Sequence, residues 1–292
     1  MDCYVYHQEI SPIHRKEVTA TQETIYRVPT PASIALLGDL HNHPWQEILH
    51  SIERNRPDLI AIAGDVIQGH LPRDPHALIV QQQEHVLPFL RACASAAPTF
   101  FSLGNHERVL CEEDLELLRE TGVVILDNSW TLWNDIAVGG LTSGYVQETR
   151  KYRASLPVQE QAVRYPYRPL TSRQTWFRHD PLQYAPDTAW LDAFEQLSCP
   201  KILLSHHPEY WPVLLEQRRI DLVLSAHCHG GQIRIGSQGL WAPGQGFLPR
   251  LTSGVHEGRF GRLIITRGLS NTAPFPRIHN PEEIVYLVPS QW

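Results

Sequence analysis

The sequence predicts an α/β fold in which buried strands carry polar side chains to one edge of a sheet. Short apolar runs alternate with stretches of helical spacing, which is the pattern of βαβ units. Five of these runs end in Asp, Asn or His, and ligands of open α/β sheets gather outside the carboxyl ends of the strands. The runs are IALLG before Asp39 and His41, DLIAIAG before Asp65, TFFSLG before Asn105 and His106, KILLS before His206, and DLVLSA before His227 and His229. We therefore expect one metal site at the carboxyl ends of these strands.

The composition is typical of a globular protein. With 292 residues the chain is long enough for a sizeable core, and we treat residues 1–292 as a single domain. The chain is 42% hydrophobic and 19% charged, with a formal net charge of −6. This acidic balance argues against a general electrostatic attraction to duplex nucleic acid or to an anionic membrane. The sequence does not indicate an oligomeric state.

The cysteines and the apolar runs indicate the cellular compartment in which the protein is expected. The five cysteines are scattered without CxxC spacing, which is typical of reduced thiols and predicts a cytoplasmic protein. The first residues contain no apolar segment of the kind found in a signal peptide. Because no apolar run approaches ~18 residues, we expect no integral membrane anchor.

The first half of the chain predicts a βαβ unit followed by further strands and helices. An alternating stretch around Val18–Val28 is typical of an edge strand or a hairpin. Pro44–Arg56 has apolar residues at helical spacing, and Asn42 is its expected N-cap. Further strands are predicted at 58–63, 99–103, 123–126 and 136–140, and helices at 76–96, bent or interrupted at Pro88, and at 112–120, ended by Gly122. The last two strands have no helix between them, so the sheet is expected to become partly antiparallel there.

Residues 142–186 differ in composition from the rest of the chain. They contain seven Lys or Arg against three acids, a net charge of +4, and seven aromatic residues are interleaved with the cations. We interpret this segment as an inserted loop or cap over the site, with a solvated excursion packed on its own aromatics as the alternative. Beyond it, helices are predicted at 187–197 and 209–219, and strands at 201–205, 221–225, 263–266 and 284–288.

The polar residues at the strand ends indicate which ions would bind. Asp, Asn and His without Cys favour Mn, Fe or Zn over a structural Cys-rich zinc site, and we expect manganese first. Seven candidate ligands are too many for one tetrahedral ion and suit two ions that share a carboxylate. Such a pair, ~3.5–4 Å apart, holds a bridging hydroxide that can attack phosphorus. The seven are Asp39, His41, Asp65, Asn105, His206, His227 and His229. His206 and His207 are adjacent and should point in different directions.

Five sequence blocks carry a resemblance to a known family. DLH, GD, GNHE, SHHP and AHCHGGQ, in this order across residues 38–232, resemble the signature blocks of the calcineurin-like metallophosphoesterase superfamily. The resemblance implies a four-layer α/β/β/α sandwich of two mixed sheets with helices outside. It implies one ion on Asp39, His41 and His229, a second on Asn105, His206 and His227, and Asp65 bridging both. By the same resemblance, His106 contacts the scissile phosphate and protonates or orients the leaving oxygen.

The C-terminal blocks are similar to those of a bacterial subgroup. AHCHGGQI with the later RGL and PRI segments resembles predicted phosphodiesterases and enzymes like UDP-diacylglucosamine pyrophosphatase. Ala226 stands where a Gly is usual and Cys228 where a small hydroxyl residue is common, and neither change removes a ligand. The subgroup often carries an N-terminal membrane anchor. Its absence from this sequence argues against a lipid-linked substrate.

Three further residues are candidates for substrate binding. His43 lies beside the DLH block and could reach a phosphate oxygen, or it could serve only at the entry of the following helix. Arg267 and Arg277 could bind a distal phosphate, and the favoured alternative is that they are exposed arginines of the tail. Cys228 is expected to face away from the metals as a small buried hydrophobe.

The function expected from these patterns is a dinuclear metal-dependent phosphoesterase. It would act on a phosphodiester or phosphoanhydride bond of a small phosphorylated substrate, nucleotide-like if the basic aromatic segment forms a binding channel. A phosphomonoesterase is the main alternative. A scaffold without catalysis is disfavoured because no ligand position is missing. A metal-dependent amidohydrolase typically has an HxH pair first, whereas this chain has DxH first and HxH last.

Overall fold

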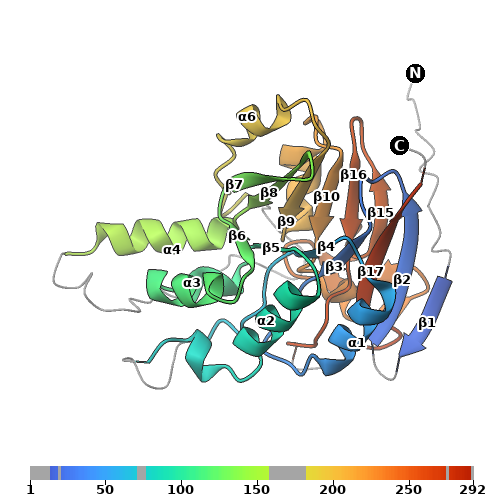
Figure 1. Cartoon of the computed structure of the whole chain (residues 1–292), viewed down its shortest axis with the longest axis horizontal. Helices are drawn as coiled ribbons and strands as arrows, with labels where there is room; N and C mark the ends of the chain where they lie inside the picture. The colour runs from blue at the N-terminus through green and yellow to red at the C-terminus, as the bar shows by residue number, and fades with distance from the viewer. Residues whose placement is uncertain (1–13, 19–20, 71–76, 158–181, 274–275, 291–292) are drawn as a thin grey trace.

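The computed structural model describes residues 14–18, 21–70, 77–157, 182–273 and 276–290. Within these residues, two mixed β-sheets pack face to face and helices lie on their outer faces (Figure 1). One sheet has the strand order β1-β2-β17-β3-β4-β5-β6 and the other has the order β15-β16-β10-β9-β8-β7. The four-layer α/β/β/α architecture expected from the sequence is therefore confirmed.

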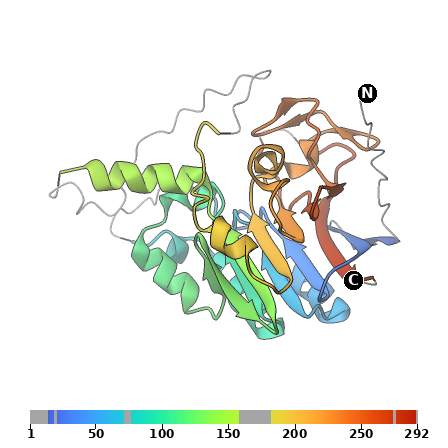
Figure 2. The same ribbon diagram turned by 90° about the horizontal axis from the view of Figure 1, so that it is seen from above.

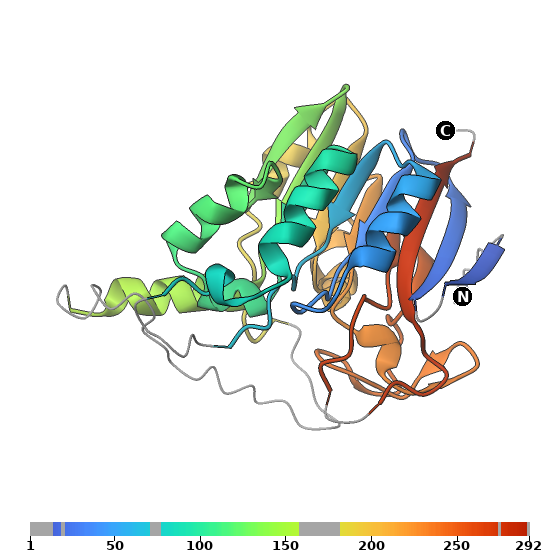
Figure 3. The ribbon, with the colours of Figure 1, turned by 60° about the horizontal axis from the view of Figure 1, so that its bottom comes forward.

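The seven-stranded sheet is parallel from β3 to β6. The C-terminal strand β17 inserts between β3, to which it is antiparallel, and β2, to which it is parallel (Figure 3). The strands β1 and β2 form an antiparallel hairpin at the edge, as the alternating stretch predicted. The bounds are β1 His14–Val18, β2 Thr21–Val28, β3 Ile34–Leu37, β4 Leu59–Ile62, β5 Thr99–Ser102, β6 Val124–Leu126 and β17 Glu282–Pro289.

The six-stranded sheet has a parallel centre with an antiparallel strand at each edge. The strands β8, β9, β10 and β16 run parallel, while β7 and β15 pair antiparallel to their neighbours. The strands predicted at 123–126 and 136–140 are β6 and β8, and they lie in different sheets because the chain passes from one sheet to the other between β6 and β7. The antiparallel pairing expected from this point on is that of β7 with β8. The bounds are β7 Ser129–Trp133, β8 Ile136–Leu141, β9 Lys201–Ser205, β10 Leu222–Ser225, β15 Gly254–Glu257 and β16 Arg262–Ile265. Two small hairpins lie between β10 and β15, namely β11 Arg234–Ile235 with β12 Gln238–Gly239, and β13 Trp241–Ala242 with β14 Gly246–Phe247.

Helices cover both outer faces of the sandwich. The helices α1 Gln46–Asn55, α2 Val86–Ala96 and α3 Glu112–Arg119 lie on the seven-stranded sheet (Figure 3). The short helix α6 Leu191–Glu195, the 3₁₀ turn η3 Pro208–Tyr210 and the π-helical turn η4 Trp211–Leu215 lie on the six-stranded sheet. The helix α4 Gly144–Ser155 projects to one side of both sheets (Figures 1 and 2). Three further 3₁₀ turns are η1 Val80–Gln82, η2 His106–Val109 and η5 His229–Gly231. No helix in the described residues is long and apolar enough to cross a membrane.

The two-residue period of the strands sorts their side chains into three core layers. In the seven-stranded sheet, Leu37 and Ile62 pack against the helices, while Leu36 and Ala61 pack between the sheets. Strand β9 divides likewise, since its alternate residues join the central layer and the outer layer under α6. Because these strands are buried on both faces, they read as continuous apolar runs in the sequence.

Two details of the first helices differ from the sequence predictions. Asn42 does not cap α1, because its side chain accepts a hydrogen bond from the backbone N–H of His85 at 2.8 Å. The predicted helix at 76–96 is interrupted before α2 and not at Pro88. Pro88 lies in the first turn of α2, where a missing N–H leaves no hydrogen bond unmade.

The second half of the chain holds the larger differences. The predicted helix at 209–219 is only the two turns η3 and η4, and that at 187–197 shortens to α6. Helix α4 and strand β7 were not predicted. Residues 158–181, the middle of the proposed 142–186 cap, lie outside the described residues, so the cap remains a prediction. In the described part of this segment, Arg150 pairs with Asp127, and Arg153 donates to the carbonyl of Leu110 at 2.7 Å. These cations hold α4 against the fold.

Candidate metal centre

The predicted ligands come together at the carboxyl ends of five strands from both sheets. Asp39 and His41 follow β3, Asp65 follows β4, Asn105 and His106 follow β5, His206 follows β9, and His227 and His229 follow β10. Nearly all of these side chains are buried. Their ligand atoms form overlapping groups within which every pair of atoms is closer than 4.8 Å.

The backbone at the site is turned into the left-handed region, which residues other than glycine rarely adopt. Five of the seven candidate ligands have a positive φ, namely Asp39 at 54°, His41 at 48°, Asp65 at 55°, His227 at 70° and His229 at 44°. Such conformations cost about 1–3 kcal/mol each and persist where the surroundings hold them, most often at functional sites. Ala226 is accommodated because Gly38 has no Cβ, and a Cβ at Gly38 would lie 2.5 Å from that of Ala226.

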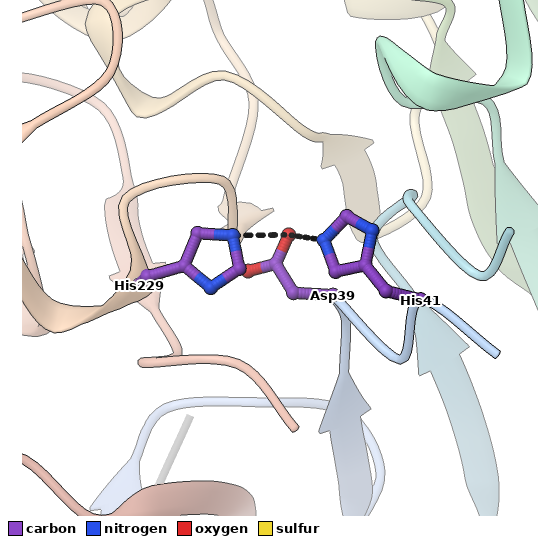
Figure 4. A group of neighbouring side chains, drawn as sticks. All are labelled: Asp39, His41 and His229. Atoms are coloured by element: carbon purple, nitrogen blue, oxygen red, sulfur yellow. Dashed lines mark ion pairs between the residues drawn. The ribbon is translucent and has the colours of Figure 1, made fainter. Parts of the chain in front are cut away.

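One group consists of Asp39, His41 and His229 (Figure 4). The Oδ1 of Asp39 lies 3.8 Å from the Nε2 of His41 and 4.0 Å from the Nε2 of His229. The Nδ1 atoms of the two histidines face the backbone carbonyls of Ile67 and Ser270, each at 3.2 Å. At His41, a donor hydrogen on Nδ1 fixes the tautomer and directs the Nε2 lone pair at the space beside Asp39. At His229, the Nδ1 also lies 3.1 Å from a guanidinium nitrogen of Arg277, which can only donate.

A second group gathers around the Nε2 atom of His206. This atom lies 3.0 Å from the Oδ2 of Asp65, 3.2 Å from the Oδ1 of Asn105 and 3.2 Å from the Nδ1 of His227. The Nδ1 of His206 lies 2.6 Å from the carbonyl of Ala63, which holds the ring from behind. Two imidazole nitrogens and two side-chain oxygens thus converge at one point.

The carboxylate of Asp65 lies between the two groups. Its Oδ2 is 3.0 Å from the Nε2 of His206 and 4.0 Å from the Nε2 of His41, and it is 3.9 Å from the Nε2 of His106. Its Oδ1 accepts the backbone N–H of His106 at 2.8 Å. A carboxylate that reaches both groups has the geometry required of a shared ligand.

Burial and neighbouring charges shift the pKa values of several residues of the two groups. Burial lowers the pKa of His41 and of His227 well below the ordinary value, and it lowers that of His229 to about 3, so these rings are neutral and offer lone pairs. Burial raises the pKa of Asp39 to about 7. Burial alone would lower the pKa of His206, but the charge of Asp65 outweighs it and raises the pKa to about 10.

One buried nitrogen indicates whether the residues of the site suit a metal ion. The Nε2 of His41 is fully buried and has no hydrogen-bond partner in the part of the chain that the structure describes. An unpaired buried polar atom is costly, and an ion between His41, Asp39 and His229 would satisfy it. The donor set of nitrogen and oxygen atoms suits divalent transition metals, so the residues present fit a two-metal site.

Glu107 supports the site, although no role for it was assigned from the sequence. Its Oε2 accepts the backbone N–H groups of Asp65 at 2.9 Å and Gly104 at 2.8 Å, and its Oε1 accepts that of Val66 at 2.9 Å. The side chain is 1% exposed. Glu107 therefore fixes the loop that carries Asp65. Its place next to His106 in the GNHE block is the only sequence signal that could have found it.

His207 points in a different direction from His206, in agreement with the expectation for adjacent histidines, and the two rings are at 86° to one another. Its Nδ1 lies 3.1 Å from the Oε1 of Glu209, and its Nε2 lies 2.8 Å from the hydroxyl of Ser143, the N-cap of α4. The same Oε1 is 3.6 Å from the Nε2 of His227. Glu209, which the sequence did not single out, thus stands behind His227 and links it to His207.

The three candidate substrate residues are all at least partly buried. His43 is half-buried, and its pKa is lowered by burial and by the charge of His85. Arg267 is 6% exposed and donates to Glu283 at 2.9 Å. Arg277 donates to the carbonyl of Arg267 at 2.7 Å and to that of Ser270, behind His229. The interpretation of both arginines as exposed residues of the tail is wrong.

Cys228 is fully buried, as expected of a small hydrophobe. Its Sγ accepts a hydrogen bond from the Nε2 of Gln245 at 3.0 Å. The thiol is occupied by this contact, which ties the turn between β13 and β14 to the loop that carries His227 and His229.

The chain is similar to several known proteins. The chain is 27% identical over 284 residues to an uncharacterized metallophosphoesterase of Campylobacter jejuni, a match that covers 93% of the chain and 62% of the relative. It is 24% identical over 262 residues to the phosphodiesterase YaeI of Escherichia coli, covering 82% of the chain and 76% of the relative. A dimetal phosphatase structure from Danio rerio aligns with a TM-score of 0.46 and 14% identity over 83% of this chain and 89% of that one.

The chain spans less than two thirds of the length of the Campylobacter relative. Residues 32–231 match the family model described as calcineurin-like phosphoesterase. This match includes all seven candidate ligands and His106, and it covers more than half of the chain. The chain therefore belongs to the calcineurin-like phosphoesterase family.

Proposed function

We propose that the protein is a dinuclear metal-dependent phosphoesterase that hydrolyses a phosphodiester or phosphoanhydride bond. The observation that supports this best is the carboxylate of Asp65, which lies within 4.0 Å of histidine nitrogens from both groups. In this proposal Asp39, His41 and His229 hold one ion, Asn105, His206 and His227 hold the other, and Asp65 is shared. Manganese is the favoured ion, with iron and zinc as alternatives.

The side chains of the protein prepare the site for this chemistry. Two ions, when bound, supply Lewis-acid charge to the phosphoryl oxygens and lower the pKa of the attacking water. The backbone carbonyls of Ile67 and Ala63 set the tautomers of His41 and His206. Burial keeps bulk water away from the ligands, which strengthens electrostatic interactions inside the site.

His106 is proposed to protonate or orient the leaving oxygen. Its side chain is 28% exposed, whereas those of Asp65 and His41 are at most 2% exposed. Its ring packs edge-on against His41 at 4.4 Å, and its backbone N–H is held by Asp65. His106 therefore lies on the open side of the ligand groups, where a leaving group could depart. A histidine in this place can act as a general acid.

The preference for diesters over monoesters rests on one relative. The Escherichia coli protein that matches 82% of the chain is a phosphodiesterase by name. A phosphomonoesterase remains the alternative function of the same centre.

The test is hydrolysis of bis(p-nitrophenyl) phosphate and p-nitrophenyl phosphate by metal-stripped protein, with and without Mn²⁺. We expect Mn²⁺-dependent release from the diester and little from the monoester. Faster release from the monoester would favour the phosphatase alternative. Hydrolysis of neither ester, by protein shown to hold two ions per chain and assayed with nucleotide diesters as well, would contradict the proposal.

A further inference from the structure

Arg108 lies beside the proposed metal centre without belonging to it. It is on the same 3₁₀ turn, η2, as His106. Its guanidinium carbon lies 6.0 Å from the ring centroid of Tyr145, the second residue of α4. Tyr145 stacks on His207 with centroids 5.9 Å apart, and His207 packs against His227 at 4.3 Å. Arg108 therefore stands where η2 and the start of α4 meet at the rim of the ligand groups.

The guanidinium of Arg108 has no anion among the described residues. Among the described residues, none forms a hydrogen bond with its buried Nε or an ion pair with its guanidinium. Arg153, Arg267 and Arg277 also have a buried Nε without a described partner, but their terminal guanidinium nitrogens donate hydrogen bonds. Arg153 and Arg277 donate to backbone carbonyls, and Arg267 pairs with Glu283.

The charge of Arg108 lies two residues after His106 on the same 3₁₀ turn. A half-buried guanidinium without a counter-charge is unfavourable in free energy. Its planar array of donors matches the oxygens of a phosphate group.

We propose that Arg108 binds a second phosphate group of the substrate, one that is not hydrolysed. The preferred substrates are then phosphodiesters or phosphoanhydrides that carry an additional phosphate. This inference rests on the proposed function and narrows its substrate class. Tyr145 supports the guanidinium from one side, while His106 keeps its place next to the scissile phosphate.

The test compares two p-nitrophenyl esters of thymidine 5′-phosphate that are identical except for a phosphate on the 3′-hydroxyl. The ratio of their kcat/KM values is measured for the Mn²⁺-loaded wild type and for R108A, R108K and R119A. We expect the wild type to prefer the 3′-phosphorylated ester, and R108A to reduce this preference by about tenfold or more. R108K should keep part of the preference, because it retains the charge without the planar fork. The control residue Arg119 is exposed, lies on α3 and pairs with Glu112, so R119A should leave the ratio unchanged.

The outcomes separate this inference from the proposed function. If R108A lowers kcat/KM for both esters by the same factor, or if the wild type shows no preference, the inference is wrong and the phosphoesterase stands. If the metal-loaded wild type hydrolyses neither ester, the role of Arg108 is tested by ligand binding instead of by hydrolysis. Calorimetry then compares thymidine 3′,5′-bisphosphate with thymidine 5′-monophosphate. Tighter binding of the bisphosphate that R108A abolishes supports the inference, and equal binding overturns it.

Discussion

The wall of the candidate site and its rim are built in different ways. The wall consists of side chains at strand ends, such as Asp39, His41 and His206, which are fully buried. Backbone carbonyls of Ile67 and Ala63 face the two histidine rings, and Asp39 accepts the backbone N–H of His227. The rim consists of η2 and the start of α4, whose residues Arg108 and Tyr145 are half-buried. The comparison suggests that the residues of the wall bind the metals and that the residues of the rim select the substrate.

The largest effect is expected from the centre of the wall, with Asp65→Asn. The amide keeps the volume but removes the charge that both ions would share, so the affinity for both should fall by more than about a hundredfold. This exceeds the 10–100-fold typical of residues that only support a ligand. The measurement is metal content per chain by elemental analysis after equilibration with Mn²⁺.

A matched control is available on the same strand. Asp58 lies at the opposite end of β4, is exposed, and accepts hydrogen bonds from Ser33. Asp58→Asn should retain two ions per chain. If Asp65→Asn also retained two ions at wild-type affinity, Asp65 would not be the shared ligand.

The second-largest effect is expected for His106→Ala, which tests whether metal binding and catalysis depend on different residues. Because His106 is not among the proposed ligands, both ions should remain bound while kcat falls by about 10²–10⁴, the range of a lost general acid. Metal content and diester hydrolysis are measured on the same sample. His50→Ala, at an exposed histidine of α1, is the control. Normal turnover in a fully loaded His106→Ala protein would contradict the proposed role.

The wall could be predicted from the sequence for a physical reason. A strand and the ligand that follows it are neighbours in the chain, and parallel strands bring their carboxyl ends to one edge. Five such pairs therefore indicated one site, and only the support from Glu107 and Glu209 was missed. Glu209 could not be found because its contact with His227 joins loops after two different strands.

The rim and the tail could not be predicted in the same way. Residues 144–155 are rich in charge and poor in apolar residues, so α4 has no clear amphipathic pattern in the sequence. It is held by Ser143 as N-cap and by the pairing of Arg150 with Asp127. Arg267 was misjudged because its partner Glu283 lies on β17, whose insertion between β2 and β3 is not a local property of the sequence.

A smaller effect in the wall is expected for Glu209→Gln. The change replaces the carboxylate behind His227 by a neutral amide and should lower the affinity for one ion by about 10–100-fold. The kcat should stay near the wild-type value at saturating metal. Calorimetric titration with Mn²⁺ separates the tighter from the weaker ion. Glu209→Asp, which keeps the charge on a shorter side chain, should recover part of the loss. Unchanged affinity for both ions in Glu209→Gln would show that Glu209 serves packing alone.

The smallest effect is expected at the base of the rim, with Arg150→Ala. Arg150 makes two hydrogen bonds to Asp127, at 3.0 and 2.7 Å, and its side chain is 38% exposed. Solvent screening limits such a pair to about 0.2–1 kcal/mol, so urea denaturation should show a shift of this size in the free energy of unfolding. Asp127→Ala and the double variant complete a cycle that isolates the coupling. Because the hydrogen bonds of Arg150 go to Asp127 and not to a candidate ligand, the metal content should not change. A loss of metal in Arg150→Ala would show that the wall and the rim form one cooperative unit. It would contradict the assignment of metal binding to the wall alone.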